Sequence, residues 1–574
     1  MFSASASSAL ATLVADPASL VRLHGVDIAV IAIYFAIVIY IGFYLKRASN
    51  TSEEFFMAGR EMTAWIAGLS FVSANLGSLE LMGWAGSAYQ YGILATHWYW
   101  IGAIPAMLFL GIIMMPFYYI SRTHSVPGYL HLRYGDGARG LSAICFAVMT
   151  VLMSGINMYA MAVVMKVMLG WDLSFSIWVS SITVAVYVAL GGLRSAIFNE
   201  VLQFLLIWLG ALLIPILGLI EAGGWTNLKH DIAMRMGQGY VHLWSTTGHF
   251  ASNPMGINSV GIIFGLGLVI SFGYWTTDFL VVQRVLSAHS LRAARMSPII
   301  GAAFKMCVPF IVILPGLLAL SVLPVHLVPA DVSKVTGQLN YNDVLPLMMV
   351  RYLGPGLLGL GVTALIAGFM SGMAGNVSAF ATVWTYDIYG AFLNKKASDS
   401  HYVAMGRWCT FIGVLVSVGT AYIALHFASI MDYVQALFSF FIAPLFGTVI
   451  LGMLWKRATK AGGFWGLLAG TSTAIGLWLW VHFQPGALRY VALSPDAKAM
   501  AADMYRALWS WIVCVIVTIV VSYMTQPRPE AELNGLVYSC TQLPEEHDDR
   551  WWQKPIVWAG LIAVVFVALN IIFW

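Results

Sequence analysis

The chain has 574 residues, of which 60% are hydrophobic and only 9% are charged. A soluble domain carries roughly 25% charged residues, and soluble cores stop growing with chain length, so this composition excludes a soluble protein and indicates an integral membrane protein. The net charge of +4 is small for this length and gives no indication of a nucleic-acid partner.

The apolar segments have the length of membrane-spanning helices. A helix that crosses a bilayer needs about 20 residues, and the sequence contains about fourteen such segments. In chain order the predicted spans are 26–45, 61–89, 94–120, 140–169, 173–191, 197–221, 256–283, 296–323, 356–386, 403–428, 433–454, 462–483, 504–524 and 555–573. The apolar segments are too long for the strands of a β-barrel, and they lack the alternation of apolar and polar residues that such strands show. We therefore expect an all-α polytopic membrane protein in contact with lipid.

The distribution of charge predicts the orientation of these spans. When residues 1–25 are placed outside as a short lead-in, most of the 29 Lys and Arg residues fall in loops on the inner side, as the positive-inside rule requires. Both termini then lie outside the cell's plasma (inner) membrane. The longest exterior segment is 222–255, and the long polar interior segment is 525–553.

Several functional classes lack their motifs in this sequence. No GxxxxGK[ST] segment is present, the five cysteines show no metal-ligand spacing, and no HExxH pair or nucleophile–base pair can be recognised. We therefore expect a protein that is no enzyme, holds no cofactor and does not use ATP. Energy for transport has to come from an ion gradient or from the gradient of the solute.

Two of the predicted spans contain small and polar residues at mid-membrane depth, at 73–78 (SANLGS) and at 271–277 (SFGYWTT). In transporters built from inverted repeats, broken helices free backbone groups that bind substrate and coupling ions. The two segments are five spans apart, as expected for the first helix of each five-helix half. The alternative is that each segment is a packing kink softened by glycine.

Six segments of the chain resemble the sodium:solute symporter family, near its sodium/glucose and sodium/galactose cotransporters. They are 52–60 (SEEFFMAGR), 73–83 (SANLGSLELMG), 191–203 (GGLRSAIFNEVLQ), 274–290 (YWTTDFLVVQRVLSAHS), 364–389 and 454–459 (LWKRAT). The resemblance covers about residues 50 to 460. It implies a LeuT-like core of ten helices in two inverted repeats, at 61–221 and 256–454. One peripheral helix, 26–45, precedes this core, and three helices within 460–574 follow it.

The resemblance also implies a sodium site, where the first broken helix meets the eighth core helix. The matching positions are Ser73, Leu76, Gly368, Ser371 and Gly372. Gly372 stands where the family usually has a second hydroxyl, so either water or Asn376 replaces that ligand or the site is weak. Ala374 and Gly375 replace the hydroxyls that flank a further sodium site in some relatives, and one sodium ion per cycle is therefore expected.

Glu200 matches an aspartate that the family places near the inner exit for sodium, which implies a role in ion release. A carboxylate that lies unpaired near the membrane is expensive and usually functional. The alternative is a carboxylate at the start of a helix, where the helix dipole favours a negative charge.

The substrate site of the sugar-transporting relatives is matched in part. Amide, ammonium and aromatic groups match at Asn75, Lys305, Gln435 and Tyr274, the last being the inner-gate tyrosine, with Trp275 beside it. The remaining positions depart from the pattern, with Glu80 for an amide or imidazole, Ser271 for an asparagine and Tyr99 for a glutamate. Such a mixture of donors, acceptors and aromatic faces suits a polyol.

A carboxylate has thus moved from position 99 to position 80, while Lys305 remains. We expect Glu80 and Lys305 to form an ion pair or a shared hydrogen bond, with Glu80 accepting from a substrate hydroxyl. A purely structural pair and a proton-coupling carboxylate are the alternatives.

The function that these observations predict is that of a monomeric, sodium-coupled symporter, which imports a monosaccharide or related polyol by alternating access. A sodium-independent facilitator, a proton-coupled transporter and a membrane solute sensor are the alternatives. The departures at Glu80, Tyr99 and Ser271 leave inositol, a sugar acid or an amino acid as further candidate solutes.

Overall fold

The computed structural model describes residues 23–45, 51–323, 326–328, 340–427, 429–542 and 550–574. The predicted lead-in, apart from residues 23–25, lies outside them. The described residues form helices and connecting segments with no β-strand, only two isolated bridges, so the all-α prediction is confirmed.

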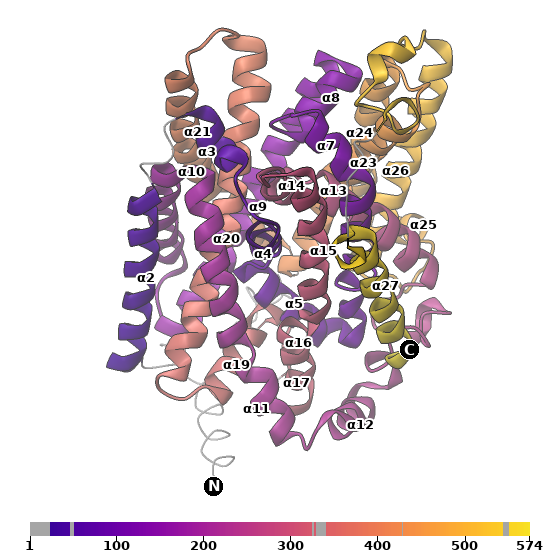
Figure 1. Ribbon diagram of the computed structural model, residues 1–574. Helices are drawn as coiled ribbons and strands as arrows, with labels where there is room; N and C mark the ends of the chain where they lie inside the picture. The colour runs from indigo at the N-terminus through magenta and orange to yellow at the C-terminus, as the bar shows by residue number, and fades with distance from the viewer. Residues whose placement is uncertain (1–22, 46–50, 324–325, 329–339, 428, 543–549) are drawn as a thin grey trace.

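The first half of the chain contains a long series of helices (Figure 1). They are α2 (Gly25–Leu45), α3 (Ser52–Met57), α4 (Ala64–Asn75), α5 (Ser78–Tyr91), α6 (Ile104–Phe109), α7 (Met115–Ile120), α8 (Val126–Tyr134), α9 (Asp136–Leu169), α10 (Leu173–Ala211), α11 (Leu213–Glu221) and α12 (Trp225–Met236). π-Helical turns over Leu110–Met114 join α6 to α7.

The second half continues the bundle. Its helices are α13 (Phe272–Thr277), α14 (Phe279–Leu286), α15 (Leu291–Cys307), α16 (Pro309–Val312), α17 (Leu314–Val322), α19 (Val344–Tyr352), α20 (Leu357–Val383), α21 (Asp399–Ala421), α22 (Ile430–Leu437), α23 (Ala443–Leu454), α24 (Lys460–Phe483), α25 (Leu488–Val491), α26 (Ala499–Met524) and α27 (Pro555–Ile572). Further π-helical turns span Gly261–Ser271, Trp384–Leu393 and Phe438–Ile442.

Ten helical stretches of the described residues are long and apolar enough to cross a membrane, or twelve if each of two bent pairs is one span. The predicted number of about fourteen is reached only when two shorter apolar stretches, 104–120 and the start of α10 at 173–182, are counted as well. The outer helices expose apolar side chains, such as Tyr40 on α2 and Val564 on α27, as helices facing lipid do. The chain is a multi-pass membrane protein.

One predicted loop is absent. The sequence analysis ends one span at residue 191 and begins the next at 197, but helical residues run without a break from Leu173 to Ala211. At about 1.5 Å per residue, such a helix is longer than the hydrocarbon core is thick. The predicted connection, residues 192–196, contains no proline, so each of its residues can donate a helical backbone hydrogen bond and the helix continues through it.

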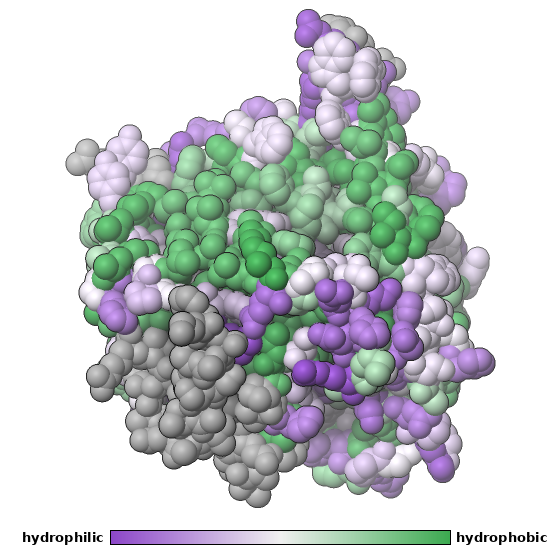
Figure 2. All heavy atoms as spheres, turned by 90° about the horizontal axis from the view of Figure 1, so that it is seen from below, coloured by the Kyte–Doolittle hydropathy of each residue, from purple (hydrophilic) through white to green (hydrophobic). Residues whose placement is uncertain are grey.

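The segments predicted to lie on one side of the membrane gather at one end of the bundle. In Figure 1, α12, α19, the start of α2 and the C-terminus lie toward the lower end, whereas α3, α8 and α14 lie toward the upper end. The last residue, Trp574, accepts hydrogen bonds from the backbone of Trp244 and Ser245 (3.0 and 3.1 Å). Viewed from the lower end, hydrophilic patches lie beside a broad apolar area (Figure 2).

The first predicted break is present within the predicted segment. Helix α4 ends at Asn75 and α5 begins at Ser78, with a bend of 56° between them. Leu76 and Gly77 form the break, with Leu76 at φ −80° and ψ 61°. Helix α4 packs against α10, α14, α15 and α20, so the break lies inside the bundle.

The second break lies one residue beyond the predicted segment 271–277. The backbone is helical through Thr277, and a bend of 49° follows at Asp278. The Asp278 side chain accepts a hydrogen bond from the Leu280 backbone N–H (2.9 Å) and caps the start of α14. Gly273 serves close packing instead, because a Cβ there would lie 2.5 Å from Ile442 Cγ2.

Candidate functional site

A cavity of about 40 Å³ lies beside the two bent helix pairs. Its wall contains all eight residues predicted to bind substrate: Asn75, Glu80, Tyr99, Ser271, Tyr274, Trp275, Lys305 and Gln435. They come from α4, α5, α13, α15 and α22 and from the segments around residues 99 and 271. The structure therefore brings together residues that are up to 360 positions apart in the sequence.

The predicted pair between Glu80 and Lys305 is present. Lys305 Nζ lies 3.6 Å from Glu80 Oε2, and Tyr99 donates a hydrogen bond to the same carboxylate oxygen. The Lys305 ammonium group also lies 4.7 Å from the centre of the Tyr99 ring and 5.2 Å from that of Trp275. These contacts stabilise a cation in a site where its side chain is only 2% exposed.

Asn75 is hydrogen-bonded at both ends of its amide. Its Nδ2 donates to Tyr274 Oη (2.9 Å) and to Glu80 Oε1 (3.2 Å), and its Oδ1 accepts from Lys305 Nζ. Asn75 is the last residue of α4, and Tyr274 belongs to α13. The amide therefore links the two bent helix pairs directly.

Some polar atoms in the cavity wall have no protein partner. Ser271 Oγ, Gln435 Oε1 and Trp98 Nε1 are buried and make no hydrogen bond. Unpartnered buried polar atoms are unfavourable unless a ligand or water satisfies them. The wall thus offers one donor, one acceptor and one hydroxyl, the groups that a polar solute with several hydroxyls requires.

The cavity also has an aromatic side that the sequence analysis did not assign. Trp84, Trp98 and Phe438 complete its wall, and the Phe438 ring centre lies 4.9 Å from that of Tyr274. Phe438 follows Gln435 by three positions, which places both on one face of a helical segment. That spacing is a signal from which Phe438 could have been predicted.

The residues predicted to bind sodium lie where the first break meets α20. Ser371 Oγ donates to the Ser73 carbonyl oxygen (2.9 Å), and the two hydroxyl oxygens lie 3.1 Å apart. Both side chains are fully buried. The contact brings two hydroxyls and one backbone carbonyl together without a formal charge, and oxygens of this kind replace the hydration shell of a monovalent cation.

The glycines of this region allow the two backbones to touch. A Cβ on Gly77, the neighbour of Leu76, would lie 3.2 Å from the Gly368 carbonyl oxygen, and a Cβ on Gly368 would lie 2.9 Å from Ser78 N. Gly372 lies against Gly77 as well. The five predicted positions therefore form one contact region, with Gly372 contributing no side-chain oxygen.

Glu200 has a partner, contrary to the expectation of an unpaired carboxylate. Arg284 Nη2 lies 2.6 Å from Glu200 Oε1, Arg284 Nε donates to Oε2 (3.3 Å), and Ser70 Oγ also donates to Oε2. Both charged side chains are completely buried. The interpretation as a helix-start residue is wrong too, because Glu200 lies far inside α10. The pair joins α10 to α14, close to both bends.

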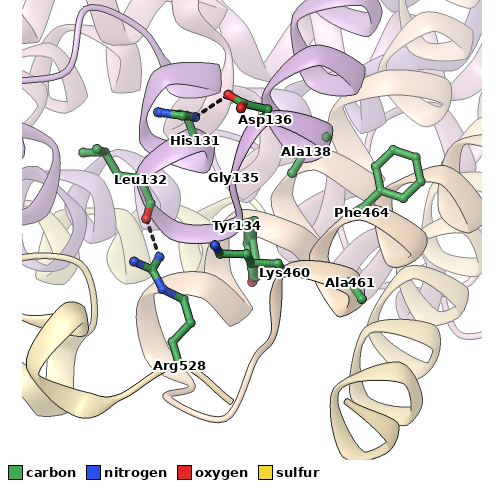
Figure 3. A pocket seen from close by; sticks show the side chains of 11 residues that line it. His131, Leu132, Tyr134, Gly135, Asp136, Ala138, Lys460, Ala461, Phe464 and Arg528 are labelled. Carbon is green, nitrogen blue, oxygen red and sulfur yellow. Dashed lines mark hydrogen bonds and ion pairs between the residues drawn. The ribbon is translucent and has the colours of Figure 1, made fainter. Parts of the chain in front are cut away.

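A second hollow, of about 630 Å³, lies among α8, α9 and α24 (Figure 3). Its lining contains none of the predicted site residues, and two polar contacts join residues of its wall. His131 Nδ1 lies 3.0 Å from Asp136 Oδ1, and Arg528 donates to the Leu132 carbonyl (2.6 Å). The unpartnered atoms described above lie in the first cavity, which we therefore take as the candidate substrate site.

Comparison with protein families decides the classification of the chain. The model of the sodium:solute symporter family matches residues 55–470, well over half of the chain. The chain belongs to the sodium:solute symporter family. The family and the curated relatives of the chain are transporters rather than enzymes.

Two curated relatives illustrate this similarity. The human sodium/glucose cotransporter 4 (Homo sapiens) is 28% identical over 553 residues, which cover 92% of this chain and 80% of the relative. The sheep sodium/glucose cotransporter 1 (Ovis aries) is 27% identical over 554 residues, 92% of this chain and 82% of the relative.

A solved structure shares the fold. A Na⁺-coupled sialic acid symporter, in a substrate-bound outward-open state, superposes with a TM-score of 0.72 at 20% identity. The match covers 88% of this chain and 99% of that symporter.

Proposed function

We propose that this chain is a sodium-coupled symporter that imports a monosaccharide or related polyol by alternating access. The observation that carries the proposal is the cavity between the bent helix pairs, because eight residues chosen from the sequence line it together. Similarity to sodium/glucose cotransporters supports the choice of solute class.

In this proposal the coupling ion binds beside the first break, at Ser73, Leu76, Gly368, Ser371 and Gly372. The solute binds in the adjacent cavity, with Glu80 and Lys305 contacting its hydroxyls, and Asn75, Tyr99, Ser271, Trp275 and Gln435 as further contacts. Tyr274, held by Asn75, moves aside when the solute leaves. Each ligand must favour the same conformation for coupling to result, and the effect is reciprocal.

The proposal includes a location and an assembly state. We place the chain in the plasma membrane with both termini outside, because of the positive-inside distribution of Lys and Arg. We assign transport to the monomer, as the fold of the family implies. Glu200 would act in ion release through its pair with Arg284.

Uptake into proteoliposomes tests the proposal. Labelled glucose, galactose, inositol, sialic acid and proline are each supplied with an inward sodium gradient, and in parallel with choline in place of sodium. Accumulation of one sugar or polyol only with sodium is the expected result. Sodium-dependent accumulation of proline alone would retain the coupling and reject the solute class.

One observation favours a second candidate, a sodium-independent facilitator. Gly372 lacks the hydroxyl that relatives of the family use at this position. In that case a solute of the panel would equilibrate at the same rate in sodium and in choline, and would not accumulate.

A further inference from the structure

Asn157 of α9 points its amide into the contact between the first break and α20. Its side chain is buried, at 4% exposure, and its Oδ1 makes no hydrogen bond. A Cβ on Gly77 would lie 3.5 Å from this oxygen. A buried amide oxygen without a partner is unfavourable, by roughly 1–3 kcal/mol in mutational data, unless something else contacts it.

The same amide fills the space beside Gly372. A Cβ on Gly372 would lie 2.8 Å from Asn157 Nδ2 and 3.4 Å from Oδ1. The first distance is too short for any real side chain, so Asn157 and a serine at 372 cannot both be present without movement. A half-turn of the amide about its last bond exchanges Oδ1 and Nδ2, so an oxygen can face either glycine.

A second buried oxygen lies at the same place. Ser78 Oγ is completely buried and has no hydrogen-bond partner, and Ser78 follows Gly77 at the start of α5. Asn376, which the sequence analysis considered as the substitute ligand, instead donates its amide to the Gly372 carbonyl oxygen of its own helix (3.1 Å). The two unpartnered oxygens thus flank the region where Ser73 meets Ser371.

We propose that Asn157 provides the side-chain oxygen that Gly372 lacks, so that an amide on α9 replaces a hydroxyl on α20 in the sodium site. Asn157 and residue 372 then form one unit, in which a side chain at position 372 displaces the amide of Asn157. This inference rests on the proposed sodium coupling. It adds α9 to the elements that a bound ion holds together.

The test measures binding of radioactive sodium to the purified full-length chain, because this needs no knowledge of the solute. N157L has nearly the shape of the native side chain and removes both polar atoms, and we expect the half-saturating sodium concentration to rise at least about 10-fold. N157D keeps the oxygen and should retain binding. T150A is the matched control, because Thr150 is also buried on α9 but bonds to its own helix at Phe146 O (2.7 Å).

A pair of further variants tests the exchange between the two positions. G372S alone should weaken sodium binding, since its Cβ collides with Asn157. N157A combined with G372S removes the collision and supplies a hydroxyl, and it should return the half-saturating concentration to within about 3-fold of the unaltered chain. Relief of the collision alone would also give this recovery, so N157A alone decides: it should weaken sodium binding as N157L does, and the added serine hydroxyl of the double variant should restore it, whereas a space-filling Asn157 leaves N157A and the double variant alike.

The outcomes separate this inference from the proposed function. Saturable sodium binding that is unchanged in N157L and not recovered in the double variant would overturn the assignment of Asn157 and leave sodium coupling intact. Absence of saturable sodium binding in the unaltered chain would overturn both. If N157L does not fold, the comparison of N157A with the double variant decides the question, because the two differ only in the hydroxyl at position 372.

Discussion

Asn75 Nδ2 donates a hydrogen bond to Tyr274 Oη across 2.9 Å, and this bond joins the end of α4 to α13. Because each residue lies next to a bend, the bond couples the two bent helix pairs at the wall of the candidate cavity. Movement of either pair has to break it or carry the other pair along.

Removing the acceptor of this bond should loosen the cavity. In Y274F the ring remains against Phe438, but Asn75 loses one partner, which is worth about 1 kcal/mol, or roughly 5-fold in an equilibrium. We expect solute exchange between the two sides to become about 5-fold faster, as measured by counterflow in proteoliposomes. An unchanged exchange rate in a folded Y274F protein would show that the bond does not restrain the bends.

The Glu80–Lys305 pair should determine solute affinity. In E80Q the ammonium loses its carboxylate and the solute loses a charged acceptor, so the half-saturating solute concentration should rise at least about 10-fold. Uptake against solute concentration measures the change. E61Q is the control, because Glu61 pairs with Arg194 (3.0 Å) and is 60% exposed.

Normal uptake by E80Q would remove Glu80 from the substrate site and leave the pair as a structural contact. A loss of pH dependence in E80Q, with solute affinity unchanged, would instead point to proton coupling through this carboxylate.

Ser371 should act on sodium rather than on the solute. Its hydroxyl contacts both the hydroxyl and the carbonyl of Ser73, so S371A should raise the half-saturating sodium concentration about 10-fold. At saturating sodium, the affinity for the solute should change little. The control is T363A on the same helix, because Thr363 bonds to the Gly359 carbonyl (2.7 Å). An equal loss in both variants would indicate a general weakening of α20.

The buried pair of Glu200 and Arg284 should matter strongly for folding. E200Q leaves a buried guanidinium without its carboxylate, which costs about 3–5 kcal/mol, whereas E200L with R284M removes both charges and should recover most of the loss. Thermal unfolding in detergent measures the difference. E530Q is the control, because the exposed pair of Lys456 and Glu530 has the same 2.6 Å separation and should contribute almost nothing.

A full-stability E200Q protein that releases sodium slowly would contradict the structural role and support ion release through Glu200. Loss of stability with a normal sodium release rate would have the opposite meaning.

Asp343 should give the stability a pH dependence. Burial raises the pKa of this carboxyl to about 6, although the Asn340 backbone N–H (2.8 Å) and the charge of Lys166 act in the opposite direction. The folded state therefore binds the proton more tightly than the unfolded state, whose Asp pKa is about 3.9. Stability from this group should increase as the pH falls from about 7 to about 4.

The variant D343N keeps the shape and an oxygen that can accept from Asn340 N–H. The difference in unfolding temperature between the unaltered chain and D343N should therefore change through the same pH window. A constant difference between pH 7 and pH 4 would contradict the raised pKa.

The sequence predicted the candidate substrate site better than it predicted the bends. Asn75 and Lys305 match substrate positions of the sugar-transporting relatives and Glu80 departs from one, so the resemblance assigned all three to one site, and all three line the cavity. The position of the second bend was wrong by one residue, because glycine and small polar residues drew attention to 271–277. The residue that ends α13 is Asp278, whose capping role depends on a local backbone contact.

Two other features could not be found from the sequence. The partner of Glu200 lies 84 positions away, and no local pattern links Glu200 to Arg284. Asn157 is a single amide in a long apolar helix, which is equally typical of a residue that packs against a neighbour. What distinguishes Asn157 is that its amide lies beside Gly77 and Gly372, and this contact is visible only in the structure.

The two bends differ in whether their polar atoms have hydrogen-bond partners within the chain. At the second bend, the Asp278 carboxylate accepts a hydrogen bond from the Leu280 backbone N–H, so the start of α14 has this partner within the chain. At the first bend, the oxygens of Ser78 and Asn157 depend on something outside the chain. The conformation of the first bend can therefore depend on whether an ion is bound. The second bend has no such dependence and changes its angle only when the first bend moves.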